Sequence, residues 1–196
     1  DLEQAAAMLR GAKKPLIVMG DGIAWSGAQE ELERLAMLIG ADVWGADNSE
    51  VNIAANHPMY HGSLGHMFGA NSSRITRQAD AVLIVGTYVF PEVFPYLDRA
   101  QIFAPGAPVI HIDLNAYEIA KNFTVDLGLV ADPKLTLGAL ADLLDRTLSD
   151  ADRQAAGDRV RASYEAKVEA IQKQMEADNR VRDQVPMQTS RFMEEL

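Results

Sequence analysis

The sequence predicts an α/β domain in which a doubly wound parallel sheet carries helices on both faces, followed by a C-terminal helical extension. Two observations lead to this prediction. Short apolar runs alternate with segments whose apolar residues recur at helical spacing. The connection between the first two runs is also too short for anything but a parallel crossover. Alternation of this kind is typical of an open parallel sheet covered on both faces.

The predicted elements follow one another in short units. Strands are expected where apolar runs occur, over 16–19, 41–45, 81–86, 109–113 and 125–130. Helices are expected where the apolar spacing is helical, over 1–11, 26–40, 69–78, 116–121 and 134–148. Ser26 is the expected N-cap of the second helix, and Gly11 and Gly40 are the expected stops of the first and second.

The chain changes character after Leu148. Residues 149–184 contain no strand pattern and are rich in charged residues, Gln and Ala, which predicts a solvated helical linker. Residues 185–196 read as the start of a following domain, after a central domain over 1–148. Because the chain begins without Met and stops inside an apolar pattern, we expect a piece of a longer polypeptide.

Composition excludes several classes of function. With 18 basic and 28 acidic residues the net charge is −10, and no basic patch is visible, so nucleic acid is not an expected partner. The absence of cysteine excludes disulfides, thiolate zinc sites and a cysteine nucleophile, and it is compatible with a cytoplasmic location. No run of about 18 apolar residues and no signal-peptide pattern is present, so no membrane association is expected.

The turn Gly20-Asp21-Gly22 is the first candidate ligand site. Ligands of parallel sheets bind at the carboxyl ends of strands, where glycine lets the backbone approach. The turn departs from the dinucleotide fingerprint, because Trp25 stands where the third glycine belongs. A phosphate site and a plain tight turn both stay open. With Asn48 the turn also resembles the metal-diphosphate motif of thiamine diphosphate enzymes, in which an aspartate and an asparagine bind magnesium. Ser49 stands where that motif has a second asparagine, so a metal site of Asp21 and Asn48 is not favoured.

Histidines and one aromatic loop are further candidates. His57, His61 and His66 lie in a segment, 56–66, that is expected to be a Gly-rich loop, and their spacing does not favour a metal site. His111, inside an apolar strand, is expected to be a core or strand-end histidine with its hydrogen bonds satisfied. The stretch 88–96, rich in aromatic residues and proline, could wall an apolar pocket, plug the domain surface or contact a subunit.

Several short motifs follow one another along the chain in a characteristic order. They are Lys14-Pro15 leading to Gly20-Asp21-Gly22, Ser26-Gly27-Ala28, His57-Pro58, His61-Gly62, the strand from Ala79 to Gly86, and Val109 to Asp113 with Glu118-Ile119 and Lys121-Asn122. Together they resemble the central domain of thiamine diphosphate-dependent 2-oxo acid decarboxylases and acetolactate synthases, over about residues 12–148. The resemblance implies a Rossmann-like sheet of about six strands.

The resemblance also implies partners. In that family the central domain lies between a pyrimidine-binding and a diphosphate-binding domain, which would hold thiamine diphosphate and magnesium. The fragment alone is then expected to be inactive, with no catalytic or metal-binding residue of its own, and the complete lyase or transferase is expected to form a homodimer or homotetramer. By likeness to benzoylformate decarboxylases, Phe90, Glu92 and Phe94 are the candidates for a substrate pocket.

Acetolactate synthases hold FAD in this domain, and the matching positions here are Gly20, Gly22, Gly62, Gly86 and Asp113. FAD is disfavoured, because Tyr88 stands where an arginine would pair with the diphosphate. Two alternatives remain from other classes. One is a sirtuin-type NAD-dependent deacylase, which the strand before Gly86-Thr87 resembles although the cysteines for its zinc are missing. The other is a non-catalytic module that binds NAD, FAD or ADP.

Overall fold

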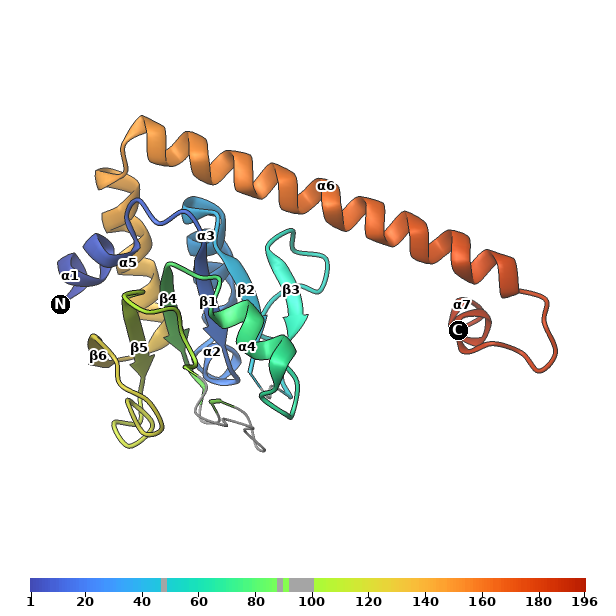
Figure 1. The fold of residues 1–196 in the computed structure, drawn as a ribbon, viewed down its shortest axis with the longest axis horizontal. Coiled ribbons are helices and arrows are strands. Elements are labelled where there is room, and N and C mark those ends of the chain that lie inside the picture. The colour runs from blue at the N-terminus through green and yellow to red at the C-terminus, as the bar shows by residue number, and fades with distance from the viewer. Residues whose placement is uncertain (47–48, 88–89, 92–100) are drawn as a thin grey trace. The chain divides into compact units, whose positions relative to one another are not determined.

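A computed structural model describes residues 1–46, 49–87, 90–91 and 101–196, and it divides them into two units, 1–160 and 161–196. Unit 1 is built on a six-stranded sheet in the order β3-β2-β1-β4-β5-β6, and every strand pair is parallel (Figure 1). The strands are β1 (Pro15–Met19), β2 (Asp42–Gly45), β3 (Tyr60–Ser63), β4 (Ala81–Val85), β5 (Val109–Asp113) and β6 (Leu127–Val130). The helices are α1 (Leu2–Leu9), α2 (Gly22–Ser26), α3 (Gln29–Ile39), α4 (Ala70–Thr76), α5 (Pro133–Thr147), α6 (Asp150–Val181) and α7 (Thr189–Glu194).

The two central strands explain why the sequence alternates apolar runs with helices. All five residues of β1 and all five of β4 are buried, and the strands pair in register, with Ile17 opposite Leu83. A strand buried on both faces needs apolar side chains at every position, so its sequence shows a continuous run instead of alternation. The predicted parallel sheet with helices on both faces is therefore confirmed.

Each face of the sheet has its own core. On one face α1, α3 and α5 pack on side chains such as Ile17, Met19 and Leu83. On the other face Val18 and Ile84 pack in a second core that includes Ile75 of α4 and an aromatic cluster, Phe68, Phe90, Phe103 and Phe123. Figure 1 shows α4 on the face opposite α3 and α5.

Three local predictions are wrong. Ser26 does not cap a helix from its N-terminus; it ends the short helix α2, and Gly27 in the left-handed conformation separates α2 from α3. Residues 60–63 form the edge strand β3 where a loop was expected. Residues 116–121 form turns, because the carboxylate of Asp113 and the amide oxygen of Asn115 accept backbone N–H groups two residues onward and compete with a helix.

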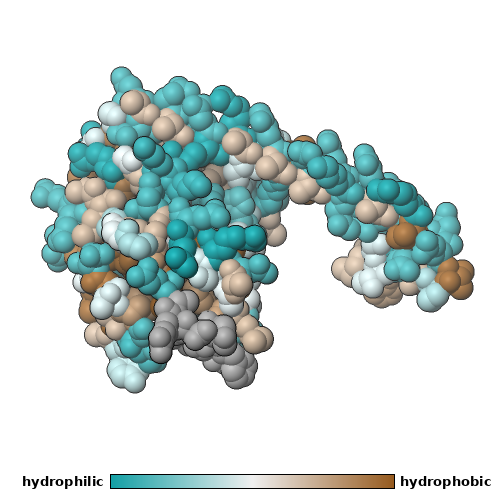
Figure 2. Space-filling view, in the orientation of Figure 1, coloured by the Kyte–Doolittle hydropathy of each residue, from teal (hydrophilic) through white to brown (hydrophobic). Residues whose placement is uncertain are grey.

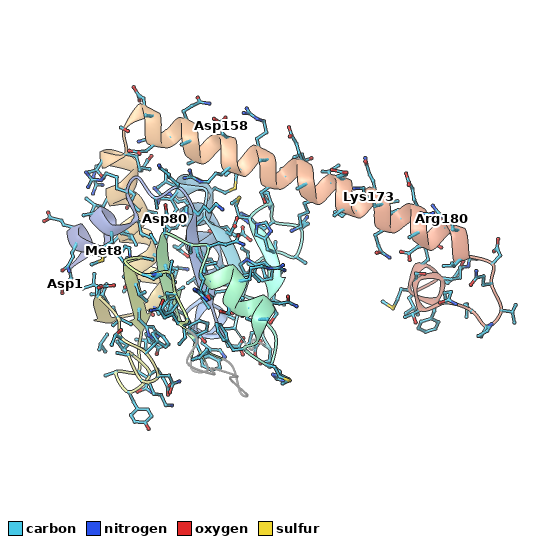
Figure 3. All side chains as sticks on the ribbon, viewed as in Figure 1. Asp1, Met8, Asp80, Asp158, Lys173 and Arg180 are labelled. Atoms are coloured by element: carbon cyan, nitrogen blue, oxygen red, sulfur yellow. The ribbon has the colours of Figure 1, made fainter. Side chains whose placement is uncertain are left out.

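The amino-end edge of the sheet is closed by polar contacts. Asp80, labelled in Figure 3, precedes β4, and its two carboxylate oxygens accept the amides of Lys13 and Lys14, each at 2.8 Å. At the same edge of β5, the carboxylate of Asp126 accepts the amide of Val109 at 2.8 Å. These acceptors satisfy amides that the parallel ladder leaves open at strand starts.

Helix α6 begins at Asp150, and its first part belongs to unit 1. Ala156 is buried, and a Cβ atom on Gly40 would come within 2.7 Å of the Ala156 carbonyl oxygen. The remainder of α6 and the short helix α7 make up unit 2, in which Arg191 pairs with Glu194 at 3.2 Å. Among the helices of the described residues, none is long and apolar enough to cross a membrane.

Candidate functional site at the carboxyl edge of the sheet

The parallel topology brings the ends of β1, β4 and β5 together, as these strands are neighbours in the sheet. A cavity of about 280 Å³ opens at this edge. Its described lining combines residues after β1 and β4 with the segment after β5 and the start of α5: Gly22, Trp25, Ser26, Gly86, Asp113, Leu114, Asn115, Glu118, Asp132 and Pro133. Three predicted site residues, Gly22, Gly86 and Asp113, therefore meet in one place.

Gly20, Gly22 and Gly86 lie so close together that a side chain on any one of them would clash with the backbone of another. The amide of Gly22 donates to the carbonyl oxygen of Gly86 at 2.8 Å. A Cβ atom on Gly22 would lie 2.6 Å from Gly86 Cα, and one on Gly20 would lie 2.6 Å from the Gly86 carbonyl oxygen. Gly86 itself has φ +63°, a conformation that favours glycine. The glycines thus let the backbone that follows β1 contact the backbone that follows β4.

The amides of the turn are already in use. Phosphate sites at helix N-termini depend on N–H groups that have no partner within the protein. Here the first three amides of α2 all donate internally: Gly22 to Gly86, Ile23 to the carbonyl of Gly20 at 3.1 Å, and Ala24 to the side-chain oxygen of Asn52 at 3.0 Å. Of the two interpretations of this turn, the geometry favours the tight turn over the phosphate site.

Asp21 fastens the segment that follows β2. Its carboxylate is 1% exposed and accepts the amide of Ser49 at 3.0 Å, the hydroxyl of Ser49 at 2.7 Å, the amide of Glu50 at 3.0 Å and the side-chain amide of Asn52 at 3.0 Å. Burial acts to raise the pKa of Asp21, but the hydrogen bonds from Asn52, Glu50 and Ser49 outweigh it and hold that pKa below 3.8. Its oxygens are occupied by donors and do not fit a magnesium ligand; Asn48 lies outside the described residues.

The cavity is acidic. Burial raises the pKa of Asp113, the amide of Asn115 opposes this, and the charge of Glu118 raises the pKa further. Glu118 pairs with Lys121 at 3.2 Å, and Asp132 accepts the amide of Leu135 at 2.9 Å as the N-cap of α5. No Lys or Arg is among the cavity's described lining residues.

The remaining predicted site residues lie elsewhere. Gly20 is buried and does not line the cavity in the described structure. Gly62 lies on the edge strand β3, where a Cβ atom added to it would lie 4.0 Å from the ring of Trp44. Phe90 is 4% exposed, its ring lies 5.4 Å from that of Phe123, and its carbonyl accepts the side-chain amide of Asn122 at 2.9 Å. Phe90 is therefore part of the core. Glu92 and Phe94 lie outside the described residues.

The histidines form no common site. His61 contacts the carboxylate of Asp42 at 3.0 Å and stacks on Trp44. Among the described residues, no group of three or more His, Cys, Asp or Glu side chains could hold a metal ion. His111 corrects an expectation: it is 2% exposed, yet neither ring nitrogen has a hydrogen-bond partner in the described structure. Burial lowers its pKa to about 4, although Glu118 acts in the opposite direction.

Sequence reasoning missed the walls of the cavity. Trp25 and Leu114 line it, although neither was predicted as a site residue, and each is more than half exposed. The only signal was position, since Leu114 directly follows β5 and Trp25 lies in the short helix α2 that follows β1. An exposed tryptophan at such a position is unusual enough to mark a surface of interest.

Comparisons with known proteins agree on one family. A model described as the central domain of thiamine pyrophosphate enzymes matches residues 2–140. The probable acetolactate synthase large subunit of Methanococcus aeolicus is 31% identical over 144 residues, which are 74% of this chain and 24% of that protein. The corresponding protein of Methanocaldococcus jannaschii is 29% identical over 198 residues, covering 100% of this chain and 31% of its own length.

A solved structure gives the same result. The thiamine diphosphate-dependent 4-hydroxybenzoylformate decarboxylase of Rhodococcus jostii RHA1 matches with a TM-score of 0.66 and 26% identity, over 76% of this chain and 27% of that one. The chain thus spans 24% to 31% of the length of these three relatives.

Proposed function

Since the chain belongs to the central-domain family of thiamine pyrophosphate enzymes, we propose that it serves as the central domain of a 2-oxo acid decarboxylase or carboligase of the acetolactate synthase type. One observation carries the proposal: the family match over 2–140 coincides with the six-stranded sheet of unit 1. The sirtuin-type deacylase and the free-standing nucleotide-binding module are not favoured by the comparisons.

Catalysis belongs to other parts of the polypeptide in this proposal. When bound in the complete enzyme, thiamine diphosphate supplies the electron sink for loss of carbon dioxide from a 2-oxo acid. We assign the cofactor and magnesium to the pyrimidine-binding and diphosphate-binding domains. The saturated carboxylate of Asp21 supports this assignment, because the turn that most resembles a metal motif has no oxygen to spare.

A flavin does not fit the carboxyl-edge cavity. Its diphosphate would need amide donors or a guanidinium, whereas the first amides of α2 donate internally and Asp113, Glu118 and Asp132 add negative charge. We propose that this member of the family binds no FAD in its central domain. The complete protein is then expected to show no flavin absorbance when purified with thiamine diphosphate and magnesium.

The contribution of unit 1 to substrate selection is proposed to come through the segment after β4. Phe90 anchors this segment in the core through its contacts with Phe68, Phe103 and Phe123 and through the bond from Asn122. Phe90 is a positioning residue in this view, and Glu92 and Phe94 are the candidates for contact with the substrate. Homodimeric or homotetrameric assembly and a cytoplasmic location complete the proposal.

The test uses the complete polypeptide encoded by the gene. We expect release of carbon dioxide from pyruvate or benzoylformate that requires thiamine diphosphate and magnesium. The 196-residue chain is expected to be inactive and to gain no thermal stability from the two ligands. Stabilisation of the chain by thiamine diphosphate would contradict the assignment of the cofactor to other domains, and an inactive complete enzyme would contradict the proposed function.

The segment after β4 has its own test in the complete enzyme. Phe94→Ala is expected to change the ratio of kcat/KM values between pyruvate and benzoylformate and to leave the affinity for thiamine diphosphate unchanged. Phe90→Leu keeps an apolar anchor and should shift the same ratio less. Unchanged ratios in both variants would remove this segment from the substrate pocket.

A further inference from the structure

The exposed hydrophobic side chains of unit 1 are concentrated at one edge. In the described part of the unit, every exposed large hydrophobic residue except Met37 on α3 lies in a segment that ends or directly follows a strand. We call the group at the ends of β1, β5 and β6 the apolar rim: Trp25, Leu114, Tyr117, Val130 and Leu135. Figure 2 shows hydrophobic residues gathered toward the end of unit 1 at which the strand arrows of Figure 1 point.

The rim is hollowed. Trp25 and Leu114 line the cavity of about 280 Å³ together with Pro133. Val130 and Leu135 line a second cavity of about 410 Å³, between the end of β6, the start of α1 and α5. The first turn of α5 lies between these hollows, since Pro133 contributes to one and Leu135 to the other. Clustered exposed apolar surface with hollows for side chains is typical of a protein-protein contact.

The exposures are high enough to need an explanation. Trp25 is 69% exposed, Leu114 62% and Leu135 75%. Val51 after β2 and Met67 after β3 are also more than half exposed. Away from the ends of the strands and the segments that follow them, large apolar side chains in the described part of unit 1 other than Met37 are packed in the two cores or partly covered, as the buried face of α3 illustrates. The amino-end edge, by contrast, is closed by the carboxylates of Asp80 and Asp126.

Charge indicates what kind of surface fits the rim. Asp113, Glu118 and Asp132 lie between the apolar residues, with no Lys or Arg in the described lining of the cavity they share. The amide of Asn115 contacts the carboxylate of Asp113, and Lys121 pairs with Glu118. A matching surface is therefore apolar and carries positive charge opposite Asp113.

We propose that the apolar rim is the surface on which a neighbouring domain of the same polypeptide docks, with apolar side chains in the two hollows and a Lys or Arg facing Asp113. This rests on the proposed function, which makes the chain one domain of a larger enzyme. The length of the relatives and the charge of the rim favour this occupant: the chain accounts for only 24% and 31% of the two archaeal proteins, so a polypeptide of their length has further domains that can pack on the rim.

The experiment is hydroxyl-radical footprinting of the complete polypeptide, with protection at each residue taken as the ratio of its modification rates in the unfolded and native protein. In unit 1 by itself the rim side chains are more exposed than that of Met37, which is 41% exposed. If nothing covers the rim, protection at Trp25, Leu114 and Leu135 should therefore be lower than at Met37. With a docked domain, we expect protection at these three residues to exceed that at Met37 by about tenfold. Protection equal to or below that of Met37 would overturn the proposal.

Charge and the identity of the occupant are tested in the same protein. Asp113→Asn is expected to lower protection at Leu114 by about threefold, whereas Asp142→Asn on α5, which breaks only the exposed pair with Arg34, is expected to leave it unchanged. If both variants changed protection at Leu114 to the same extent, the proposed Lys or Arg facing Asp113 would be contradicted. Protection that is lost on dilution to monomers would assign the rim to a second subunit and overturn the same-chain occupant.

The two proposals fail separately. A protected rim in a polypeptide that releases no carbon dioxide from any 2-oxo acid would contradict the proposed function and leave the docking surface intact. An active enzyme whose rim is as reactive as Met37 would contradict the docking surface alone.

Discussion

Gly22 and Gly86 touch through their backbones: the amide of one donates to the carbonyl oxygen of the other at 2.8 Å, and a Cβ atom on Gly86 would lie 2.9 Å from Gly22 Cα. This contact joins the segments that follow two central strands, and both glycines line the carboxyl-edge cavity. It also explains why glycines occur here in a chain that lacks a complete dinucleotide fingerprint. Close backbone approach is a sufficient reason for them.

Gly86→Ala tests this contact. The variant adds a clash to an unfavourable φ, so we expect it to lose about 3 kcal/mol of unfolding free energy in urea titrations. Gly27→Ala is the matched control, because Gly27 also has φ +63° but nothing lies within 4 Å of its added Cβ atom. The control should lose about 1 kcal/mol. Similar losses in both variants would mean that the Gly22 contact relaxes without cost.

Asp21→Asn tests the fastening of the segment after β2. Asparagine replaces one acceptor oxygen by a donor that faces the amide and hydroxyl donors of Ser49, so we expect a loss of about 2 kcal/mol. The wild-type carboxylate has a pKa below 3.8 in the folded state, so its contribution is present above that pH and is lost as the pH falls through the folded value.

The measurement is urea unfolding between pH 2 and 6. The variant should lack the part of the acid-induced loss that Asp21 contributes. Glu50→Gln, which alters an exposed side chain in the same segment, is the control and should behave like the wild type. If Asp21→Asn retains the wild-type stability and pH profile, the four hydrogen bonds do not hold this segment.

His111 makes the domain sensitive to mild acid. The folded protein holds its pKa at about 4, whereas the unfolded chain has a value near 6.5. Between these values His111 binds a proton in the unfolded state but not in the folded state, so the free energy of unfolding falls as the pH drops from 6.5 to 4. The difference amounts to up to about 3 kcal/mol.

His111→Phe is expected to remove this part of the pH dependence, because an aromatic ring can keep the stacking on Phe123 without a titrating group. The check is the midpoint of thermal unfolding at pH 7 and pH 5 for both proteins. A matched His66→Gln change, at an exposed histidine, should leave the difference between the two pH values as in the wild type. A variant as acid-sensitive as the wild type would contradict the prediction.

Arg159 holds the first part of α6 on unit 1. Its guanidinium donates to the carbonyl oxygens of Ile39 at 2.7 Å and Gly40 at 3.0 Å, where α3 ends. A cation there also favours the helix dipole. Arg159→Met keeps the length of the side chain, so we expect a loss of about 1–2 kcal/mol in chemical unfolding of unit 1. Arg180→Met, farther along α6, should have no effect on that transition.

Elements with a local sequence pattern could be predicted, whereas elements that depend on contacts between distant segments could not. The runs at β1 and β4 were predictable because strands buried on both faces must be apolar throughout. The edge strand β3 was not, because its residues Tyr60 to Ser63 alternate between partly buried and exposed and include a glycine at φ +112°. Its pairing with β2 is a long-range contact that no local pattern announces.

The candidate site divides in the same way. The approximate place of the site was predictable, since Gly22, Gly86 and Asp113 follow recognisable strands. Their chemistry was not: the sequence could not show that the amide of Ala24 is taken by Asn52 or that Phe90 turns into an aromatic core. The prediction that His111 has its hydrogen bonds satisfied was wrong for the same reason. Hydrogen-bond partners of a buried side chain are supplied by the fold and not by its neighbours in the sequence.

The sequence by itself determined the class of the domain, the order of its units and its likeness to one enzyme family, since these depend on periodicity and on motif spacing along the chain. The tertiary structure decided which glycines support each other, which carboxylate is saturated and which edge of the sheet carries exposed apolar side chains. Those properties depend on contacts between residues far apart in the chain, such as Asp21 with Asn52 and Gly22 with Gly86. Folding alone brings such pairs together.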